Sequence, residues 1–191
     1  MAAVLPSSRT PMKHRITVDE YYRMGEAGIL KPDQRVELLD GDIYDMNPIG
    51  SLHASTVREI SLQFAQAALD GRIIASVQDP LRLDDETEPV PDFMALAPRP
   101  GKYRTSHPGG RDVLLLVEVA DTSLEYDKAK LPGYARSGVC EVWIVDISSR
   151  SILVYRNRGD GQYGDTETKT EGLLAADRLP DCPVNLDTVF G

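Results

Sequence analysis

The sequence predicts a mixed fold of the α/β (α+β) class, in which a central β-sheet is flanked by two principal helices. The run 113–117 is continuously apolar, which is typical of a strand covered on both faces. A helical pattern over 124–137 follows and leads directly into a second apolar strand at 140–147. Strand, helix and strand in fewer than 40 residues indicate a right-handed crossover between parallel strands.

The length of 191 residues fits one domain of ordinary size. We expect residues 1–15, which include no carboxylate, to form a disordered tail, and residues 16–191 to form the single domain. No apolar stretch is long enough to span a bilayer. The cysteines, Cys140 and Cys182, lie in unrelated segments, so we expect neither a zinc site nor a disulfide, and a cytoplasmic location.

A short helix and a hairpin are predicted after the tail. Thr17 and Glu20 have the spacing of a capping box, and Gly28 ends the helical pattern that follows. The dipeptide Asp40-Gly41 supplies the positive φ angles of a tight hairpin turn. We therefore place strands at about 35–39 and 42–46.

The rest of the chain supplies one more long helix and the main sheet. Apolar residues at helical spacing predict this helix over 51–69, and Gly71 ends it. A Gly/Pro-rich loop at 97–110 separates two strands, and the last strands form a meander at the sheet edge. The strands are placed at 72–78, 89–96, 112–120, 140–147, 151–158 and 162–170.

The charge balance restricts the partners. Acidic residues outnumber basic ones by 30 to 21, which gives a net charge of −9. This balance argues against a protein that wraps nucleic acid by bulk electrostatics. Any contact with nucleic acid therefore has to be local.

Three carboxylates, Glu37, Asp92 and Glu118, occur where the pattern predicts an apolar interior. An ionised carboxylate in apolar surroundings is costly unless it is paired or binds a cation. Asp92 begins one predicted strand and Glu118 interrupts the most hydrophobic one, so adjacent strands would bring them together. A divalent cation would remove their repulsion, and oxygen ligands favour Mg²⁺ or Mn²⁺ over zinc.

An ammonium group near such a cation would stabilise the charge that develops on a phosphodiester. Ala120, which shares a strand face with Glu118, cannot supply this ammonium group. On the next helix, Tyr126, Lys130 and Tyr134 are four residues apart and share one face. We choose Lys130 over Lys128 and expect the tyrosines to pack.

Several segments together resemble a known family. They are, in chain order, RVELLDGDIYDMNP with His53, PVPDFMAL, LLVEVADTS and YDKAKLPGYARSGVCEVWIVD. In this order and at these separations they resemble the Uma-two family of restriction-endonuclease-like proteins, a branch of the PD-(D/E)XK nuclease superfamily. The resemblance covers residues 16–146 and most of the remainder.

The resemblance implies a restriction-endonuclease-like core, a central mixed sheet flanked by helices. Asp92 would be the acid of the PD motif and Glu118 the acidic member of the (D/E)XK motif. Both would be metal ligands, together with the backbone carbonyl of Val119.

The resemblance also implies roles for other residues. Glu37 matches the acid of the family's N-terminal hairpin and would be a third metal ligand or an orienting base. His53 matches a family histidine and would contact metal-bound water or phosphate. The sequence departs from the motif at Ala120, where the lysine should stand, and Lys130 on the following helix maps onto the relocated lysine.

The candidates also have ordinary structural alternatives: a buried ion pair for Glu118, a turn after proline for Asp92, an exposed partner of Arg35 or Lys31 for Glu37, a solvated helix lysine for Lys130, and a polar helix start for His53. We give Gln78 low weight as a residue of the site. Trp143 and Tyr155 are expected to be core or interface aromatics.

The loop between the strands that bear Asp92 and Glu118 is basic, with no acid between positions 93 and 110. We expect it to hold phosphates beside the metal, although a flexible solvated connection is the alternative. Its basic residues are Arg99, Lys102, Arg104, His107 and Arg111.

The sequence therefore predicts a Mg²⁺- or Mn²⁺-dependent endonuclease that hydrolyses DNA. We expect a homodimer, because such an assembly matches the two-fold symmetry of a duplex. Two alternatives remain. One is a nuclease-fold module that binds or regulates without activity, which the acidic charge and Ala120 favour. The other is a structural homodimer whose buried carboxylates form an ion-pair network.

Overall fold

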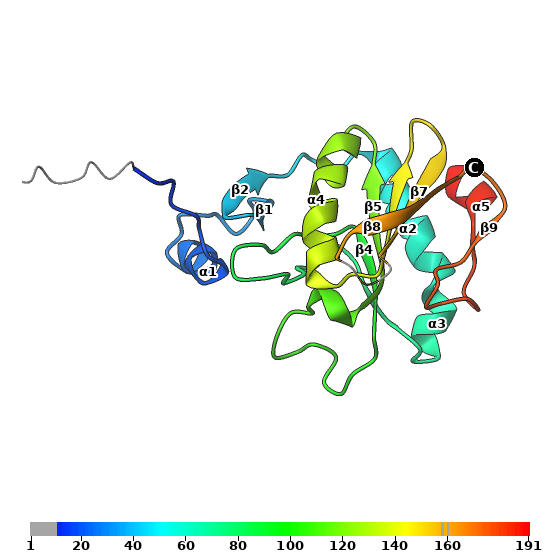
Figure 1. Ribbon diagram of the computed structural model, residues 1–191, viewed down its shortest axis with the longest axis horizontal. Coiled ribbons are helices and arrows are strands. Elements are labelled where there is room, and N and C mark those ends of the chain that lie inside the picture. The colour runs from blue at the N-terminus through cyan, green and yellow to red at the C-terminus, as the bar shows by residue number, and fades with distance from the viewer. Residues whose placement is uncertain (1–10, 158, 160) are drawn as a thin grey trace, which may run out of the picture.

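A six-stranded sheet forms the centre of the protein, whose computed structural model describes residues 11–157, 159 and 161–191 (Figure 1). The β5–β6 pair is parallel, and the other pairs of this sheet are antiparallel within the described residues. In spatial order the strands are β3 (Ile74–Ser76), β4 (Phe93–Leu96), β5 (Val113–Ala120), β6 (Glu141–Asp146), β7 (Ser151–Asn157) and β8 (Tyr163–Lys169). The predicted mixed fold is confirmed.

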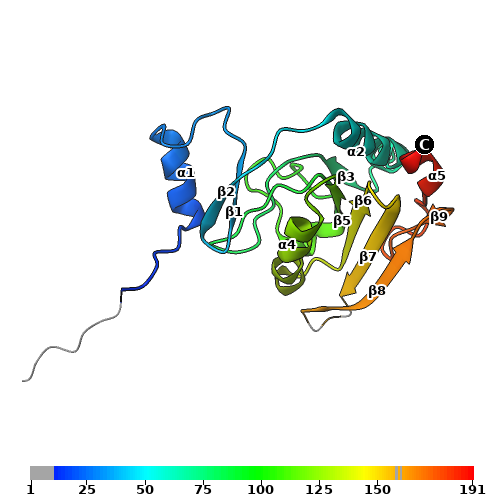
Figure 2. The same cartoon turned by 90° about the horizontal axis from the view of Figure 1, so that it is seen from above.

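Helices cover both faces of the sheet (Figure 2). Helix α4 (Leu124–Ser137) connects the parallel pair and packs on the face that includes Leu116 and Ala120. Helix α2 (Ser51–Gln63) packs on the opposite face, together with the C-terminal helix α5 (Leu186–Phe190). Because side chains alternate along β5, Glu118 lies on the α4 face.

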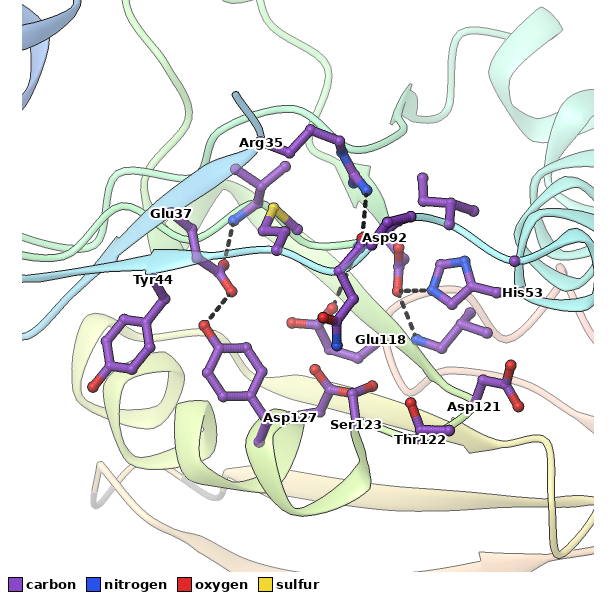
Figure 3. Close-up of a pocket in the computed structure, with 18 of the residues that line it drawn as sticks. Arg35, Glu37, Tyr44, His53, Asp92, Glu118, Asp121, Thr122, Ser123 and Asp127 are labelled. Carbon is purple, nitrogen blue, oxygen red and sulfur yellow. Dashed lines mark hydrogen bonds and ion pairs between the residues drawn. The ribbon is translucent and has the colours of Figure 1, made fainter. Parts of the chain in front are cut away.

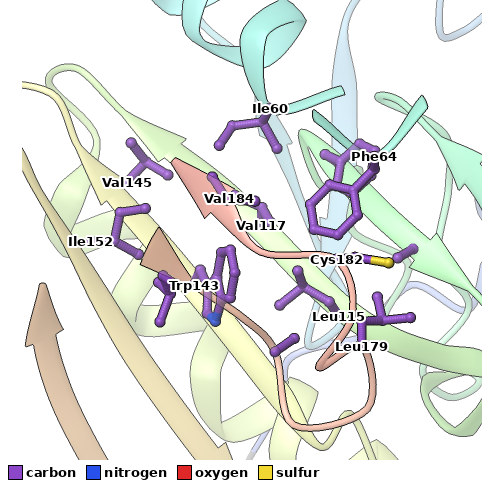
Figure 4. Packing of buried hydrophobic residues seen from close by; sticks show 14 of the residues in the cluster. Ile60, Phe64, Leu115, Val117, Trp143, Val145, Ile152, Leu179, Cys182 and Val184 are labelled. Atoms are coloured by element: carbon purple, nitrogen blue, oxygen red, sulfur yellow. The ribbon is translucent and has the colours of Figure 1, made fainter. Parts of the chain in front are cut away.

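The opposite layer contains the larger hydrophobic cluster (Figure 4). Phe64 stacks on Phe93 with ring centroids 5.1 Å apart, and Trp143 is fully buried. Trp143 is therefore a core residue and cannot contribute to an interface. Its indole N–H donates to Glu141, whose second oxygen accepts from the backbone of Asp177 and ties the C-terminal segment to the sheet.

A helix and a hairpin precede the sheet, as predicted. Helix α1 (Val18–Glu26) begins with a complete capping box between Thr17 and Glu20. Strands β1 (Val36–Leu39) and β2 (Asp42–Asp45) form a separate two-stranded sheet. Their turn has φ angles of 48° at Asp40 and 76° at Gly41, as the Asp-Gly dipeptide indicates.

The structure differs from the sequence prediction in several elements. The helix expected over 51–69 is divided at Phe64 into α2 and α3 (Ala65–Leu69). A 3₁₀ turn, η1 (Gly110–Asp112), precedes β5. The two-residue strands β9 (Leu173–Leu174) and β10 (Val184–Asn185), like α5, were not predicted, because such short elements have no measurable periodicity.

The expected tail lies partly outside the described residues, which begin at residue 11. Residues 11–15 form neither helix nor strand, but Arg15 contacts the hairpin turn. Its Nε lies 2.7 Å from a carboxylate oxygen of Glu86, and its backbone lies against Gly41. No helix among the described residues is long and apolar enough to cross a membrane.

Candidate active site

The register between β4 and β5 brings the two central carboxylates together. Phe93 pairs with Val117, so Asp92 comes opposite Glu118 one position further along. The backbone N–H of Asp92 lies 3.4 Å from Oε2 of Glu118, and the N–H of Val119 donates to Oδ2 of Asp92 at 2.9 Å. The predicted convergence of these two residues is therefore observed.

The hairpin delivers Glu37 to the same place. Its side chain is fully buried, which excludes an exposed cross-strand role. Oε2 of Glu37 accepts from the backbone N–H of Val90 at 3.0 Å, and Oε1 accepts from the hydroxyl of Tyr126 at 2.6 Å. Both oxygens of this carboxylate are thus hydrogen-bonded within the protein.

Lys130 reaches into the centre of this group from α4. Its side chain is only 4 % exposed, which excludes a solvated helix lysine. The Nζ atom lies 3.2 Å from Oε1 of Glu37, 3.2 Å from Oε1 of Glu118 and 3.4 Å from Oδ1 of Asp127. Glu118 therefore forms the buried ion pair that was one of its alternatives, and it also lies beside Asp92.

The burial of this cluster changes its protonation equilibria. Desolvation raises the pKa of Glu118 to about 8, although the nearby ammonium of Lys130 acts in the opposite direction. Burial also raises the pKa of Asp127. Desolvation opposes the charge of Lys130, but the carboxylates around it outweigh this effect and raise its pKa. The lysine therefore stays protonated at neutral pH.

Asp92 is held by groups from three other segments. His53 on α2 places Nε2 3.1 Å from Oδ2 of Asp92, and Gln78 donates to Oδ1 at 3.0 Å. Burial opposes ionisation of Asp92, but these hydrogen bonds and that from Val119 lower its pKa. The hydrogen bond with Asp92 raises the pKa of His53.

One cleft of about 440 Å³ lies beneath the hairpin (Figure 3), and its lining includes Glu37, His53, Asp92, Glu118, Asp127 and Lys130. Besides the residues described above, the β2–α2 connection and the start of α4 form its walls. The acidic side chains in the lining are Glu37, Asp45, Asp92, Glu118, Asp121 and Asp127, and its cations are Arg35 and Lys130, with His53 close by.

The basic loop lies elsewhere. It leaves β4 at Leu96 and enters β5 at Val113, at the strand ends opposite to the cleft. Arg99 packs on the ring of Tyr103 at 4.0 Å, and none of the loop's basic side chains lines the cleft. The expectation that Arg99, Lys102 and Arg104 lie beside the carboxylates is therefore wrong. The carboxylates stand at one end of the β4–β5 pair, and the loop connects the two strands at the other end.

Some residues of the site were missed by sequence reasoning. Asp127 stands three positions before Lys130, a spacing that places both on one helix face and could have indicated it. Tyr134 is buried as expected but also donates to Oε1 of Glu118 at 2.6 Å. Gln78, to which the sequence gives low weight, belongs to the site through its hydrogen bond to Asp92 and has a left-handed backbone, with φ of 54°.

The side chains alone do not form a three-ligand metal cluster. Among the described residues, no group of three or more His, Cys, Asp and Glu side chains has the arrangement that could hold a metal ion. Any metal bound at Asp92 and Glu118 therefore needs further ligands from backbone oxygens or water.

Comparisons with solved structures support the fold. The crystal structure titled "a putative nuclease belonging to DUF820 from Anabaena variabilis ATCC 29413" matches with a TM-score of 0.73 and 15 % identity, over 92 % of this chain and 97 % of that chain. The type IIG restriction endonuclease BpuSI gives a TM-score of 0.40 and 11 % identity, over 62 % of this chain and 14 % of that one. No curated protein matches.

The family comparison covers most of the chain. The family described as "Uma2: Putative restriction endonuclease" matches residues 18–186, which include every carboxylate of the cleft. The matched segment begins at α1 and ends at the first residue of α5. The chain therefore belongs to the Uma2 family and has a nuclease fold of the restriction-endonuclease type.

Proposed function

We propose that the protein is a divalent-metal-dependent endonuclease of the PD-(D/E)XK type that hydrolyses phosphodiester bonds in DNA. The observation that carries this proposal is the adjacency of Asp92 and Glu118 at the base of a cleft, with the ammonium of Lys130 3.2 Å from Glu118. Two acids and a lysine around one point can bind a hard cation and stabilise a phosphoryl oxygen.

The donor set fits Mg²⁺ or Mn²⁺. Asp92 and Glu118 supply carboxylate oxygens, and Mg²⁺ is commonly held by one or two carboxylates together with water. Val119 would add its backbone carbonyl. Its N–H already donates to Asp92, and the N–H and C=O of one strand residue point to the same side. A bound cation would polarise the phosphodiester and lower the pKa of a coordinated water.

Each side chain of the cluster has a separate task in this proposal. Lys130, protonated because carboxylates surround it, supplies positive charge next to the reacting phosphate and cannot act as a base at neutral pH. Glu37 orients Lys130, whose Nζ lies 3.2 Å from Oε1 of Glu37. His53 fixes the carboxylate of Asp92 through Nε2.

Cleavage of plasmid DNA in Mg²⁺ tests the proposal. Wild-type protein should convert supercoiled DNA to nicked or linear forms, and EDTA should abolish this conversion. Asp92→Asn and Glu118→Gln should each reduce the rate at least about 100-fold, because each removes charge that binds the cation. Isothermal titration with Mg²⁺ should show weaker binding by the same variants.

A matched control separates the site from general damage to the fold. Glu141 is as deeply buried as Glu118, at 2 % exposure, and stands on the neighbouring strand outside the cleft. Glu141→Gln should therefore retain cleavage. If Asp92→Asn and Glu118→Gln cleave at the wild-type rate, or if wild type neither cleaves DNA nor binds Mg²⁺, the proposed function is wrong.

A further inference from the structure

Resting on the proposed function, we infer that the cleft admits a single-stranded DNA chain and excludes an intact duplex, and that Tyr44 is the surface on which an unpaired base stacks. The inference follows from three features of the described residues. They are the enclosure of the acids, the attachment of the hairpin above them, and an exposed aromatic ring at the mouth of the cleft.

Asp92 and Glu118 are buried too deeply for a phosphate of double-stranded DNA to reach them. The side chain of Glu118 is 2 % exposed and that of Asp92 is 12 % exposed. The volume of about 440 Å³ lies within the range of pockets that enclose one small molecule. A phosphate of a duplex lies on the surface of a rigid double helix that cannot follow it into such a space, whereas a flexible single strand can bend one nucleotide into it.

The roof of the cleft is fixed to the rest of the protein. Leu38 of β1 forms a bridge with Glu88, in which the N–H of Glu88 donates to the carbonyl of Leu38 at 2.7 Å. The N–H of Gly41 donates to the carbonyl of Glu86 at 2.8 Å. Lifting the hairpin for a duplex would break these bonds and would also separate the buried Glu37 from Lys130.

Tyr44 provides the surface on which a base would stack. It pairs with Glu37 across the hairpin, so both side chains lie on the same face of β1–β2, the face that lines the cleft. Tyr44 is 41 % exposed (Figure 3). Its ring centroid lies 5.7 Å from that of Tyr126. Unpaired bases stack on such exposed rings without regard to sequence.

The charge distribution of the cleft also favours contact with a single phosphate over contact with a row of phosphates. Six acids line the cleft, and its cations are Arg35 and Lys130, which is ion-paired with Glu37. Arg35 donates to the backbone carbonyl of Asn47 at 3.1 Å and forms no ion pair among the described residues, so its charge is available to one phosphate. A duplex-binding surface would need a row of such cations, and the basic loop lies at the other end of the strands.

Two closed circles of the same sequence test the inference. A single-stranded circle and a relaxed, covalently closed duplex circle are incubated with wild-type protein and Mg²⁺. The duplex is relaxed because negative supercoiling opens unpaired segments, through which the supercoiled plasmid of the preceding test can be cleaved. The single-stranded circle should be cleaved at least about tenfold faster, given the stacking energy that only unpaired bases can supply. Equal or faster cleavage of the relaxed duplex would overturn the inference and leave the proposed function intact. Cleavage of neither circle would instead contradict the proposed function.

Binding provides a readout that does not require cleavage. The fluorescence anisotropy of a labelled single-stranded oligonucleotide is measured in Ca²⁺, a hard cation with oxygen ligands. Tyr44→Leu should weaken its affinity about tenfold, and Tyr44→Phe, which keeps the ring, should restore it. Tyr22→Leu removes an equally exposed ring from α1, outside the cleft, and should not weaken binding. Wild-type affinity in Tyr44→Leu, or equal losses in both leucine variants, would contradict the inference.

Discussion

The Nζ atom of Lys130 lies 3.2 Å from Oε1 of Glu118, although the glutamate belongs to strand β5 and the lysine to the helix that follows it. Ala120, which shares a strand face with Glu118, packs in the hydrophobic layer under α4. The ammonium group beside Glu118 therefore comes from the helix and not from the strand. The same Nζ atom also approaches Glu37 and Asp127, so one cation neutralises part of a buried group of acids.

Replacement of Lys130 by an uncharged residue should destabilise the fold. Lys130→Met leaves the fully buried Glu37 without its counter-charge, and breaking such a pair typically costs about 3–5 kcal/mol. Urea denaturation followed by circular dichroism measures the loss. Lys128→Met is the matched control, because Lys128 pairs with Glu125 on the exposed side of the same helix and should have almost no effect. Similar losses in both variants would contradict the role of the cluster.

The stability of the metal-free protein should decrease as the pH rises from 4.5 to 8. Glu118 has a pKa of about 8 in the folded protein against an ordinary value of 4.5, so between these values the folded state holds a proton that the unfolded chain releases. The free energy of unfolding then falls with pH, by at most about 1.4 kcal/mol per unit for this one group.

Unfolding in EDTA across this pH range measures the slope. Asp127, whose pKa is also raised by burial, adds to the decrease, so the comparison with a variant is decisive. Glu118→Gln should flatten the curve, because it removes the titrating group and keeps a side chain of similar shape. An unchanged slope in this variant would show that Glu118 does not hold the proton.

The hairpin turn that positions Glu37 should be sensitive to a single methyl group. Gly41 has a φ of 76°, and a Cβ there would lie 2.6 Å from Cβ and 3.0 Å from Cα of Arg15. Gly41→Ala therefore adds a backbone clash to the strain of a left-handed residue and should cost about 2–4 kcal/mol.

Gly71→Ala provides the control for strain alone. Gly71 has a φ of 72°, but a Cβ there would meet no atom within 4 Å. This variant should lose only about 1–2 kcal/mol by thermal or urea unfolding. If Gly71→Ala is as damaging as Gly41→Ala, the close approach of Arg15 to the turn is not important for stability.

Much of the local structure could be predicted from neighbouring residues. The capping box at Thr17 and Glu20, the Asp40-Gly41 turn and the αL glycine Gly138 after α4 each act within a few positions of the chain. The carboxylate of Glu118 could be selected for a similar reason, since it interrupts an apolar strand where an unpaired charge would be costly.

The order of the main helices and strands, the parallel crossover and the choice of Glu37, Asp92, Glu118 and Lys130 as candidates followed from the sequence. The burial of Glu37 against Lys130, the approach of Asp127 and Tyr134, and the position of the basic loop at the far end of the strands depend on the folded arrangement. Helix caps and turns depend on contacts close in sequence, whereas these placements depend on strand register and on the packing of a distant hairpin.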